Sequence, residues 1–286
     1  MAKTIAFLGI GAMGARMSKN LVDAGFDVRG YSPSKSTRAA AEERGVPTVA
    51  SSAEAAEGAD LILSCVPATE HMIATYLGPH GAFETARSGA VCFDFSTVSV
   101  AGSLRVAQEA QQRGLSFLDT PVAGSTPQAE KGALAVMVGG DQAIAEAHRD
   151  VLDVVGGSVS YFGENGSGLK MKFVTNLILG VHMTAIAEGI NLGARSGLDT
   201  AAMLEFLPNT SIPRLLTARA TQLTERSYPA GFPIELLSKD LSLILEAAEL
   251  VQMPLPLGST TKQLLVRADA IGHAKSDMSA VSEVYA

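Results

Sequence analysis

The feature that most constrains this chain is the glycine-rich segment GIGAMG at residues 9–14. Residues 4–8 (TIAFL) before it form a short apolar run typical of a buried strand. After it, apolar side chains recur every four residues over 13–21, which is the spacing of one helix face. Gly25 is placed to end that helix, and residues 27–31 predict a second strand. A strand, a glycine turn, a helix and a strand within about 30 residues predict a parallel βαβ unit.

The spacing of these glycines at the start of a helix predicts a site for the pyrophosphate of a dinucleotide. Gly9 permits the tight turn, Gly11 lets the backbone approach the phosphates, and Gly14 lets the helix pack on the strand. We expect Met13, within the same turn, to contact the cofactor too, because N–H groups at a helix start favour anions. The alternative is a glycine-rich turn without a ligand, and the strand–helix–strand context argues against it.

The end of the second predicted strand indicates which dinucleotide is bound. A carboxylate for the ribose 2′-hydroxyl of NAD is expected near Ser32, but none is present, and Asp27 lies at the wrong end of the strand. Ser32, Ser34, Lys35 and also Arg38 supply the donors and positive charge that a 2′-phosphate needs. The pattern favours NADP(H) over NAD(H). The alternative is a solvated turn with no role in specificity.

The remaining hydrophobic patterns divide the chain into a half with alternating strands and helices and a half with helices alone. Five further short apolar runs predict strands: 61–66, 91–95, 115–119, 133–140 and 159–163. Beyond the polar joint at 164–168, only helical patterns follow: 169–195, 200–207, 213–225, 234–252 and 258–272. We therefore predict a Rossmann-type α/β domain over 1–163, with a doubly wound, mostly parallel sheet. An all-α domain over 164–286 follows it, joined by a long helix.

Ligands of open α/β sheets bind beyond the carboxyl ends of the strands, so the residues placed there are candidates. Small residues and hydroxyls at these ends would leave room for a nicotinamide ring and a small substrate. Each could instead serve a turn, and Ser96-Thr97 could equally start a helix. The candidates are Val66, Pro67, Ser96, Thr97, Ala123, Gly124 and Ser125.

Polar side chains in the helical half supply the candidates for proton transfer. Lys172 and Asn176 are four residues apart and share one face of a helix with apolar neighbours. A lysine in apolar surroundings loses its proton more readily than an exposed one, which suits an acid or base. A lysine whose charged end reaches solvent is the alternative, and Lys170 fits that role as well. The adjacent Lys239 and Asp240 are typical of a solvated helix face.

Taken together, these motifs resemble the β-hydroxyacid dehydrogenase family, which includes 3-hydroxyisobutyrate dehydrogenases and semialdehyde reductases. Five blocks match in order and span nearly the whole chain: 7–25, 94–99 (DFSTVS), 119–141, 166–176 (GSGLKMKFVTN) and 238–241 (SKDL). Five ordered blocks are far more specific than any single one. The resemblance implies a Rossmann domain followed by an all-α domain, and assembly as a homodimer or homotetramer.

The resemblance also implies roles for residues. Counting four on from Gly168 selects Lys172 as the catalytic acid/base, with Asn176 holding the substrate. Thr97, Val66, Pro67 and Lys239 would lie along the cofactor, with Asp240 orienting Lys239. Ser96, Ala123, Gly124, Ser125 and Asp240 would line the substrate pocket. The implied reaction is hydride transfer between NADP(H) or NAD(H) and a small anionic hydroxy acid or semialdehyde.

Two departures from the family pattern bear on this reading. The substrate loop commonly reads P-V-S-G-G, but Ala123 removes the first hydroxyl and Ser125 adds one two residues later. Backbone N–H groups at Gly124 and Ser125 could still hold a carboxylate. Residues 32–34 (SPS) stand where NADP-using relatives often have Asn-Arg. An imine reductase or a catalytically silent dinucleotide-binding module are the alternatives, and the presence of Lys172 argues against both.

Composition excludes other classes of protein. A net charge of −7 argues against a nucleic-acid-binding domain. Cys65 and Cys92 lie in apolar runs that predict buried strands, and two cysteines make neither a disulfide framework nor a zinc site. No cluster has metal-ligand spacing, and the apolar stretch 173–193 is interrupted by polar residues, which predicts a buried helix and no membrane partner. The N-terminal apolar run is too short for a signal peptide, so we expect a cytoplasmic protein.

The substrate itself is not named by the sequence. Residues 211–232 are expected to contribute to the pocket, and Arg214 or Arg219 could pair with an anionic group. A solvated position on a helix is the more ordinary reading of both arginines.

Overall fold

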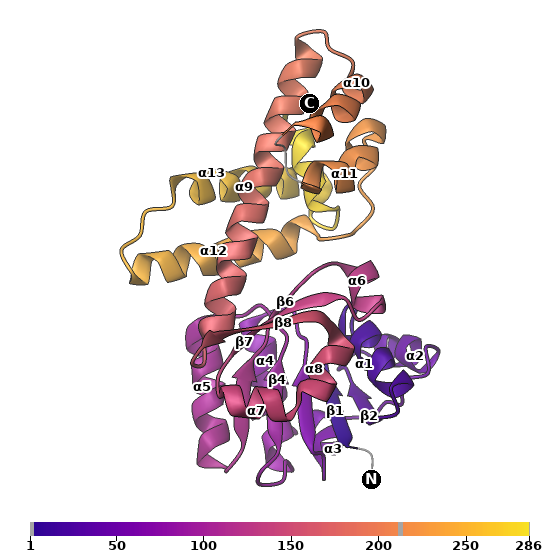
Figure 1. Cartoon of the computed structure of the whole chain (residues 1–286), viewed down its shortest axis with the longest axis vertical. Helices are drawn as coiled ribbons and strands as arrows, with labels where there is room; N and C mark the ends of the chain where they lie inside the picture. The colour runs from indigo at the N-terminus through magenta and orange to yellow at the C-terminus, as the bar shows by residue number, and fades with distance from the viewer. Residues whose placement is uncertain (1–2, 211–213, 286) are drawn as a thin grey trace. The chain divides into compact units, whose positions relative to one another are not determined.

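The computed structural model describes residues 3–210 and 214–285. The chain divides into two compact units, Met1–Lys172 and Phe173–Ala286. The boundary falls within α9 (Ser167–Arg195), a helix of 29 residues that is seen in full in Figure 1.

The first unit is built on an eight-stranded sheet. Its strands are β1 (Thr4–Leu8), β2 (Asp27–Tyr31), β3 (Leu61–Ser64), β4 (Val91–Asp94), β5 (Ser116–Asp119), β6 (Val122–Ala123), β7 (Leu134–Gly139) and β8 (Gly156–Gly163). Their order is β2-β1-β3-β4-β5-β7-β6, with β8 also paired to β7. Strands β1 to β5 are mutually parallel, so the carboxyl ends of β1, β3, β4 and β5 meet at one edge.

The far side of the sheet departs from a repeating βαβ pattern. Strand β7 pairs antiparallel with both β5 and β6, so the sheet is mostly but not wholly parallel, as predicted. The segment between β5 and β7 holds only β6 and the five-residue helix α6 (Thr126–Glu130). A parallel return needs a crossover of a dozen or more residues, usually with a full helix, and this segment uses its length on β6 instead.

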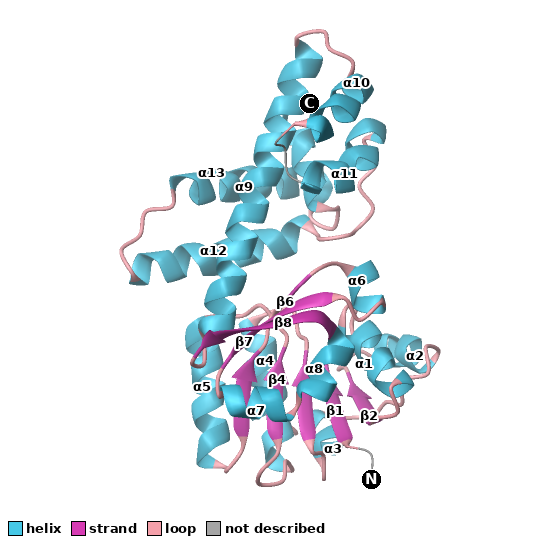
Figure 2. Cartoon of the chain, in the orientation of Figure 1, coloured by secondary structure: helices cyan, strands magenta, loops and turns pink. Residues whose placement is uncertain are grey.

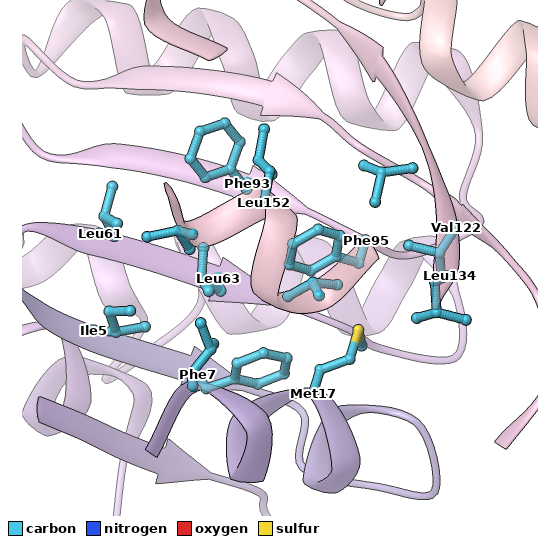
Figure 3. Packing of buried hydrophobic residues seen from close by; sticks show 14 of the residues in the cluster. Ile5, Phe7, Met17, Leu61, Leu63, Phe93, Phe95, Val122, Leu134 and Leu152 are labelled. Atoms are coloured by element: carbon cyan, nitrogen blue, oxygen red, sulfur yellow. The ribbon is translucent and has the colours of Figure 1, made fainter. Parts of the chain in front are cut away.

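Alternation of side chains along the strands produces two hydrophobic cores. On one face Ile5, Phe7, Leu63 and Phe93 pack with Met17 of α1 (Gly14–Asp23), as Figure 3 shows. The opposite face carries a second buried cluster that includes Tyr76 of α4 (Thr69–Leu77). The helices of this unit are α1 (Gly14–Asp23), α2 (Lys35–Glu42), α3 (Ser52–Ala56), α4 (Thr69–Leu77), α5 (Val100–Gln112), α6, α7 (Gln142–Ala147) and α8 (Arg149–Val155). Covering helices on both faces confirm the doubly wound architecture.

Figure 2 shows helices and loops throughout the second unit. They are α10 (Thr200–Phe206), α11 (Arg214–Glu225), α12 (Ile234–Leu250) and α13 (Pro256–Ala268), with 3-10 helices at Leu207–Asn209 and Met278–Tyr285 and a π-helical segment at Asp269–His273. No strand is assigned within the part of this unit that the structure describes. The expected all-α domain is therefore confirmed, although α13 starts two residues and ends four residues earlier than its pattern predicts.

Two expectations about buried residues have mixed outcomes. Cys92 is fully buried in β4, which raises the pKa of its thiol, whereas Cys65 is only half-buried just after β3.

Among the described residues, α9 alone is long and apolar enough to cross a membrane, and 44% of its most apolar window is buried in the structure. Polar side chains within α9 have partners in the second unit: Thr184 contacts Thr261 at 3.2 Å between their hydroxyl oxygens.

Candidate active site

The glycine turn between β1 and α1 has the geometry that its sequence predicts. Gly9 has φ +95°, and a Cβ there would lie 2.3 Å from the Cys65 carbonyl oxygen. A Cβ at Gly14 would lie 1.9 Å from the Gly9 carbonyl oxygen. At Gly11, by contrast, no atom lies within 4 Å of that position. The first and third glycines are thus required by the fold, whereas the second leaves open space for a ligand to approach the backbone.

A cavity of about 330 Å³ opens beside this turn, between α1 and α2. Gly11, Arg16, Ser36, Thr37 and Arg44 are among the residues that line it. Two guanidinium groups, two hydroxyls and an unhindered glycine backbone are the donors and positive charges that phosphate groups require. The residues present therefore fit the phosphates of a dinucleotide.

The loop after β2 gathers the four residues expected to select the cofactor. Ser32 is buried, and its carbonyl oxygen accepts a hydrogen bond from Arg38 Nη1 at 2.5 Å. Ser34 caps α2, since its Oγ accepts from the Thr37 N–H at 3.2 Å. Lys35 is exposed at the first residue of α2. Residues 31–38 contain no Asp or Glu, so this loop presents donors and positive charge but no carboxylate.

The carboxyl ends of β3 and β4 are joined through Ser96. The Ser96 hydroxyl donates to Asp94 Oδ1 at 2.5 Å and accepts from the Val66 N–H at 2.8 Å. Ser96 is 2% exposed, whereas Thr97 beside it is half-buried and Pro67 is exposed. Ser96 thus fixes the backbone at Val66 relative to the end of β4.

Sequence reasoning did not anticipate the buried polar network beneath these ends. The Tyr76 hydroxyl donates to Ser64 Oγ at 2.8 Å, and the Ser64 hydroxyl donates to Asp94 Oδ1 at 2.6 Å. All three side chains are fully or almost fully buried. The clue in the sequence was a charged residue inside an apolar run, FDF, because a buried carboxylate must find hydrogen-bond donors.

The loop after β5 leads through Ala123 to Gly124, which has φ +137°, and to Ser125, which begins α6. The Ser125 N–H donates to Gln128 Oε1 at 3.0 Å, and its hydroxyl donates to the same oxygen. Both donors of Ser125 are therefore engaged within the loop. The expectation was that the N–H groups of Gly124 and Ser125 hold a carboxylate, and the Ser125 N–H can do so only if Gln128 releases it.

In α9 the structure separates the two candidate lysines by burial. Lys172 is 8% exposed, whereas Lys170 lies on the exposed side of the helix. Asn176, one turn after Lys172, is 2% exposed and donates to Asp240 Oδ2 of α12 at 2.6 Å. Lys239 Nζ lies 2.8 Å from Asp240 Oδ1. Asp240 is 3% exposed, so Lys239-Asp240 is not the solvated face that its pattern suggests.

The two arginines considered for the substrate have different outcomes. Arg219 Nε lies 2.8 Å from Oδ1 of the fully buried Asp277, so it forms a structural ion pair and not a solvated helix charge. The side chain of Arg214 lies outside the described residues, as do residues 211–213 of the expected pocket segment. Within the described part of the chain, no group of three or more His, Cys, Asp or Glu is placed to hold a metal ion.

Comparisons with known proteins agree with this geometry. A family model described as the NAD-binding domain of 6-phosphogluconate dehydrogenase matches residues 4–163. A second, described as NAD-binding of NADP-dependent 3-hydroxyisobutyrate dehydrogenase, matches residues 166–285. The chain belongs to the β-hydroxyacid dehydrogenase family. It is an NAD(P)-dependent oxidoreductase of the hydroxyacid dehydrogenase class, EC 1.1.1.

Similar dehydrogenases cover almost the whole of this one. A probable mitochondrial 3-hydroxyisobutyrate dehydrogenase of Dictyostelium discoideum is 34% identical, over 98% of this chain and 90% of its own. A 2-(hydroxymethyl)glutarate dehydrogenase of Eubacterium barkeri is 33% identical, over 98% and 94%. The structure of Mycobacterium tuberculosis 3-hydroxyisobutyrate dehydrogenase with L-serine has TM-score 0.89 and 32% identity, covering 99% of both chains.

The alternative of an imine reductase is supported only at the level of fold. An imine reductase from Pseudomonas has TM-score 0.63 and 16% identity to this dehydrogenase, with both chains fully covered. These neighbours are more distant than the hydroxyacid dehydrogenases.

Proposed function

We propose that this dehydrogenase transfers hydride reversibly between NADP(H) and a small anionic β-hydroxy acid or its semialdehyde, with Lys172 as acid and base. The observation that carries the proposal is the burial of Lys172 one helical turn before Asn176, which hydrogen-bonds to Asp240. Burying polar side chains costs free energy unless they have hydrogen-bond partners. The burial of Lys172 and Asn176 on one face of an apolar helix therefore favours a functional role for both.

The bound nicotinamide supplies the hydride in reduction and accepts it in oxidation. Lys172, as an ammonium, donates a proton from Nζ to the substrate oxygen as negative charge develops there in reduction. In oxidation Lys172 is neutral and accepts the hydroxyl proton at Nζ. An ammonium aimed at the developing oxyanion binds the transition state more strongly than the ground state, which is the condition for catalysis. Asn176 holds the substrate, with its amide oriented by Asp240.

The preferred cofactor is NADP(H). The absence of a carboxylate in residues 31–38 and the presence of Arg38 and Lys35 support this choice. The remaining cofactor contacts that we propose are Gly9, Gly11, Met13 and Gly14 at the pyrophosphate, Ser32 and Ser34 at the 2′-phosphate, and Val66, Pro67, Thr97 and Lys239 toward the nicotinamide.

The substrate is a small hydroxy acid, of the class on which the similar dehydrogenases act according to their names. The substrate contacts that we propose are Ala123, Gly124, Ser125 and Asp240, with Ser96 acting through the backbone at Val66. We further propose functional domains 1–163 and 164–286, a cytoplasmic homodimer or homotetramer, and no nucleic-acid or membrane partner. The net charge of −7 and the buried polar contacts of α9 support the last point.

The test measures initial rates with NADPH and then NADH against glyoxylate and the succinic, methylmalonic and tartronic semialdehydes. We expect turnover with NADPH, and a fall in kcat of about a hundredfold or more in Lys172→Ala, because general acid–base groups contribute factors of that order. Lys170→Ala is the matched control and should retain the wild-type rate, because Lys170 lies on the exposed side of α9. Near-normal kcat in Lys172→Ala would refute the assignment. Binding of NADPH without turnover of any substrate would favour a silent binding module.

A further inference from the structure

The helix that carries Lys172 begins on a buried carboxylate. Asp119, the last residue of β5, is fully buried. Its Oδ1 accepts a hydrogen bond from the Gly166 N–H at 2.6 Å, and its Oδ2 accepts one from the Leu169 N–H at 2.9 Å. The first N–H groups of a helix have no partner within the helix itself. Asp119 therefore caps α9 from a strand that is 47 residues earlier in the chain.

Glycines allow this contact to be close. A Cβ at Gly168 would lie 2.4 Å from the Met137 carbonyl oxygen and 3.0 Å from Asp119 Oδ2. A Cβ at Gly139 of β7 would lie 2.6 Å from the Gly168 nitrogen and 2.7 Å from Asp119 Oδ1. No side chain larger than hydrogen fits at either position without displacing backbone. The first turn of α9 is thus seated directly on β5 and β7.

A third hydrogen bond fixes the approach to this turn. Asn165 Nδ2 donates to the Phe117 carbonyl oxygen of β5 at 2.7 Å. Three hydrogen bonds and two glycine contacts therefore determine where α9 starts. Lys172 is three residues after Leu169, and its Cα follows rigidly from that start because the intervening residues are continuous helix.

We propose that Asp119 is a positioning residue, which sets the place of the Lys172 ammonium through the first turn of α9. This inference rests on the proposed role of Lys172. An alternative cap made by a residue of α9 itself would stabilise the helix equally well but would not fix it to the sheet. The carboxylate at the end of β5 does both, and β5 also leads directly into the substrate loop at Ala123 and Gly124.

The test is Asp119→Asn in the full-length enzyme. Asparagine has nearly the same shape but keeps one acceptor oxygen, so one of the two N–H groups loses its partner. A small displacement of a catalytic group can lower the rate by factors approaching a hundred. We expect kcat to fall about tenfold to a hundredfold, while the dissociation constant of NADPH, measured by its fluorescence, stays within about twofold.

Asp141→Ala is the control for the loss of a helix cap. Asp141 caps α7 in the same unit, with Oδ1 accepting from the Ala143 and Ile144 N–H groups at 2.8 and 3.2 Å. Both N–H groups share this one oxygen, which Asn would keep, so alanine is needed to remove the cap, and we expect kcat to be unchanged in Asp141→Ala. Equal losses of kcat in both variants would overturn the proposal, because the effect would then be general to helix capping.

The double variant Asp119→Asn, Lys172→Ala separates the two ideas. If Asp119 acts through Lys172, adding Asp119→Asn to Lys172→Ala lowers the residual kcat no further. A loss of kcat that equals the product of the two single losses overturns the proposal. If Lys172→Ala alone keeps normal kcat, the proposed function fails independently of Asp119. Should Asp119→Asn not fold by circular dichroism, Asn165→Ala provides the test: a lower kcat with NADPH binding retained supports positioning, and an unchanged kcat overturns it.

Discussion

At the scale of single residues, the carboxyl edge of the sheet carries a buried polar row. Ser64, Asp94 and Asp119 are register partners on β3, β4 and β5, so their side chains emerge on the same face. Burial raises the pKa of Asp119 to about 6, and the nearby Asp94 carboxylate adds to this, while the hydrogen bonds from Gly166 and Leu169 partly oppose it. Asp119 is therefore a carboxyl group that titrates close to neutrality.

This raised pKa makes stability depend on pH. An Asp carboxyl in an unfolded chain has a pKa of about 4, so the folded state binds the proton more tightly. The contribution of Asp119 to the free energy of unfolding is greatest below about pH 4 and is lost as the pH rises through about 6. Asp119→Asn does not titrate. We expect its stability relative to wild type to rise by about 2–3 kcal/mol between pH 4 and 7, as measured by urea denaturation. A difference independent of pH would contradict the raised pKa.

Which site residues the sequence revealed depends on the range of the interaction involved. Gly9 and Gly14 follow from local spacing, which one motif contains in full. The choice of Lys172 over Lys170 rested on the family resemblance, because helical spacing alone left both readings open. Asp119 and Gln128 were missed as interacting residues, because their contacts depend on how a strand end meets a helix start or how a loop closes. A charged residue that ends an apolar run, as in SFLD, marks a buried carboxylate but does not say which N–H groups it will meet.

At the scale of elements, local patterns predicted most strands and helices to within a few residues. They did not predict the short strand β6 or the antiparallel direction of β7, because direction is set by the connection and by pairing partners, not by side-chain alternation. Helix caps were predicted less well than the helices and strands themselves, but better than strand direction. Ser34 was predicted as a phosphate ligand, and the structure shows that its hydroxyl also accepts the Thr37 N–H as the cap of α2.

Ser34→Asp separates these two roles, because Asp caps a helix as well as Ser does. The new carboxylate would repel a 2′-phosphate and could accept a hydrogen bond from a ribose hydroxyl. We expect the dissociation constant of NADPH to rise at least about tenfold, that of NADH to stay constant or fall, and the melting temperature to be retained. Ser51→Asp, at the equivalent cap of α3, controls for added charge and should leave both constants unchanged. Equal weakening of both cofactors would place the 2′-phosphate elsewhere.

At the scale of the whole molecule, the first family model ends at residue 163, before α9, and the second, also described as NAD-binding, begins at residue 166. The glycine turn and the proposed acid and base thus lie in segments that different models match. Lys172 is the last residue of the first compact unit, while Asn176 and Asp240 belong to the second. Substitutions at the glycine turn and at Lys172 should affect different measurements.

Cofactor binding should stabilise the fold without any contribution from Lys172. A ligand at about one hundred times its dissociation constant raises the free energy of unfolding by about 2.7 kcal/mol. We expect this shift with NADPH in the wild type and in Lys172→Ala, and none in Gly11→Asp. Because no atom lies within 4 Å of a Cβ at Gly11, Gly11→Asp should keep the melting temperature of the unliganded protein. Its side chain would occupy the space left for the pyrophosphate and repel it. A shift that persists in Gly11→Asp would exclude this turn as the phosphate site, and one lost in Lys172→Ala would assign Lys172 to cofactor binding.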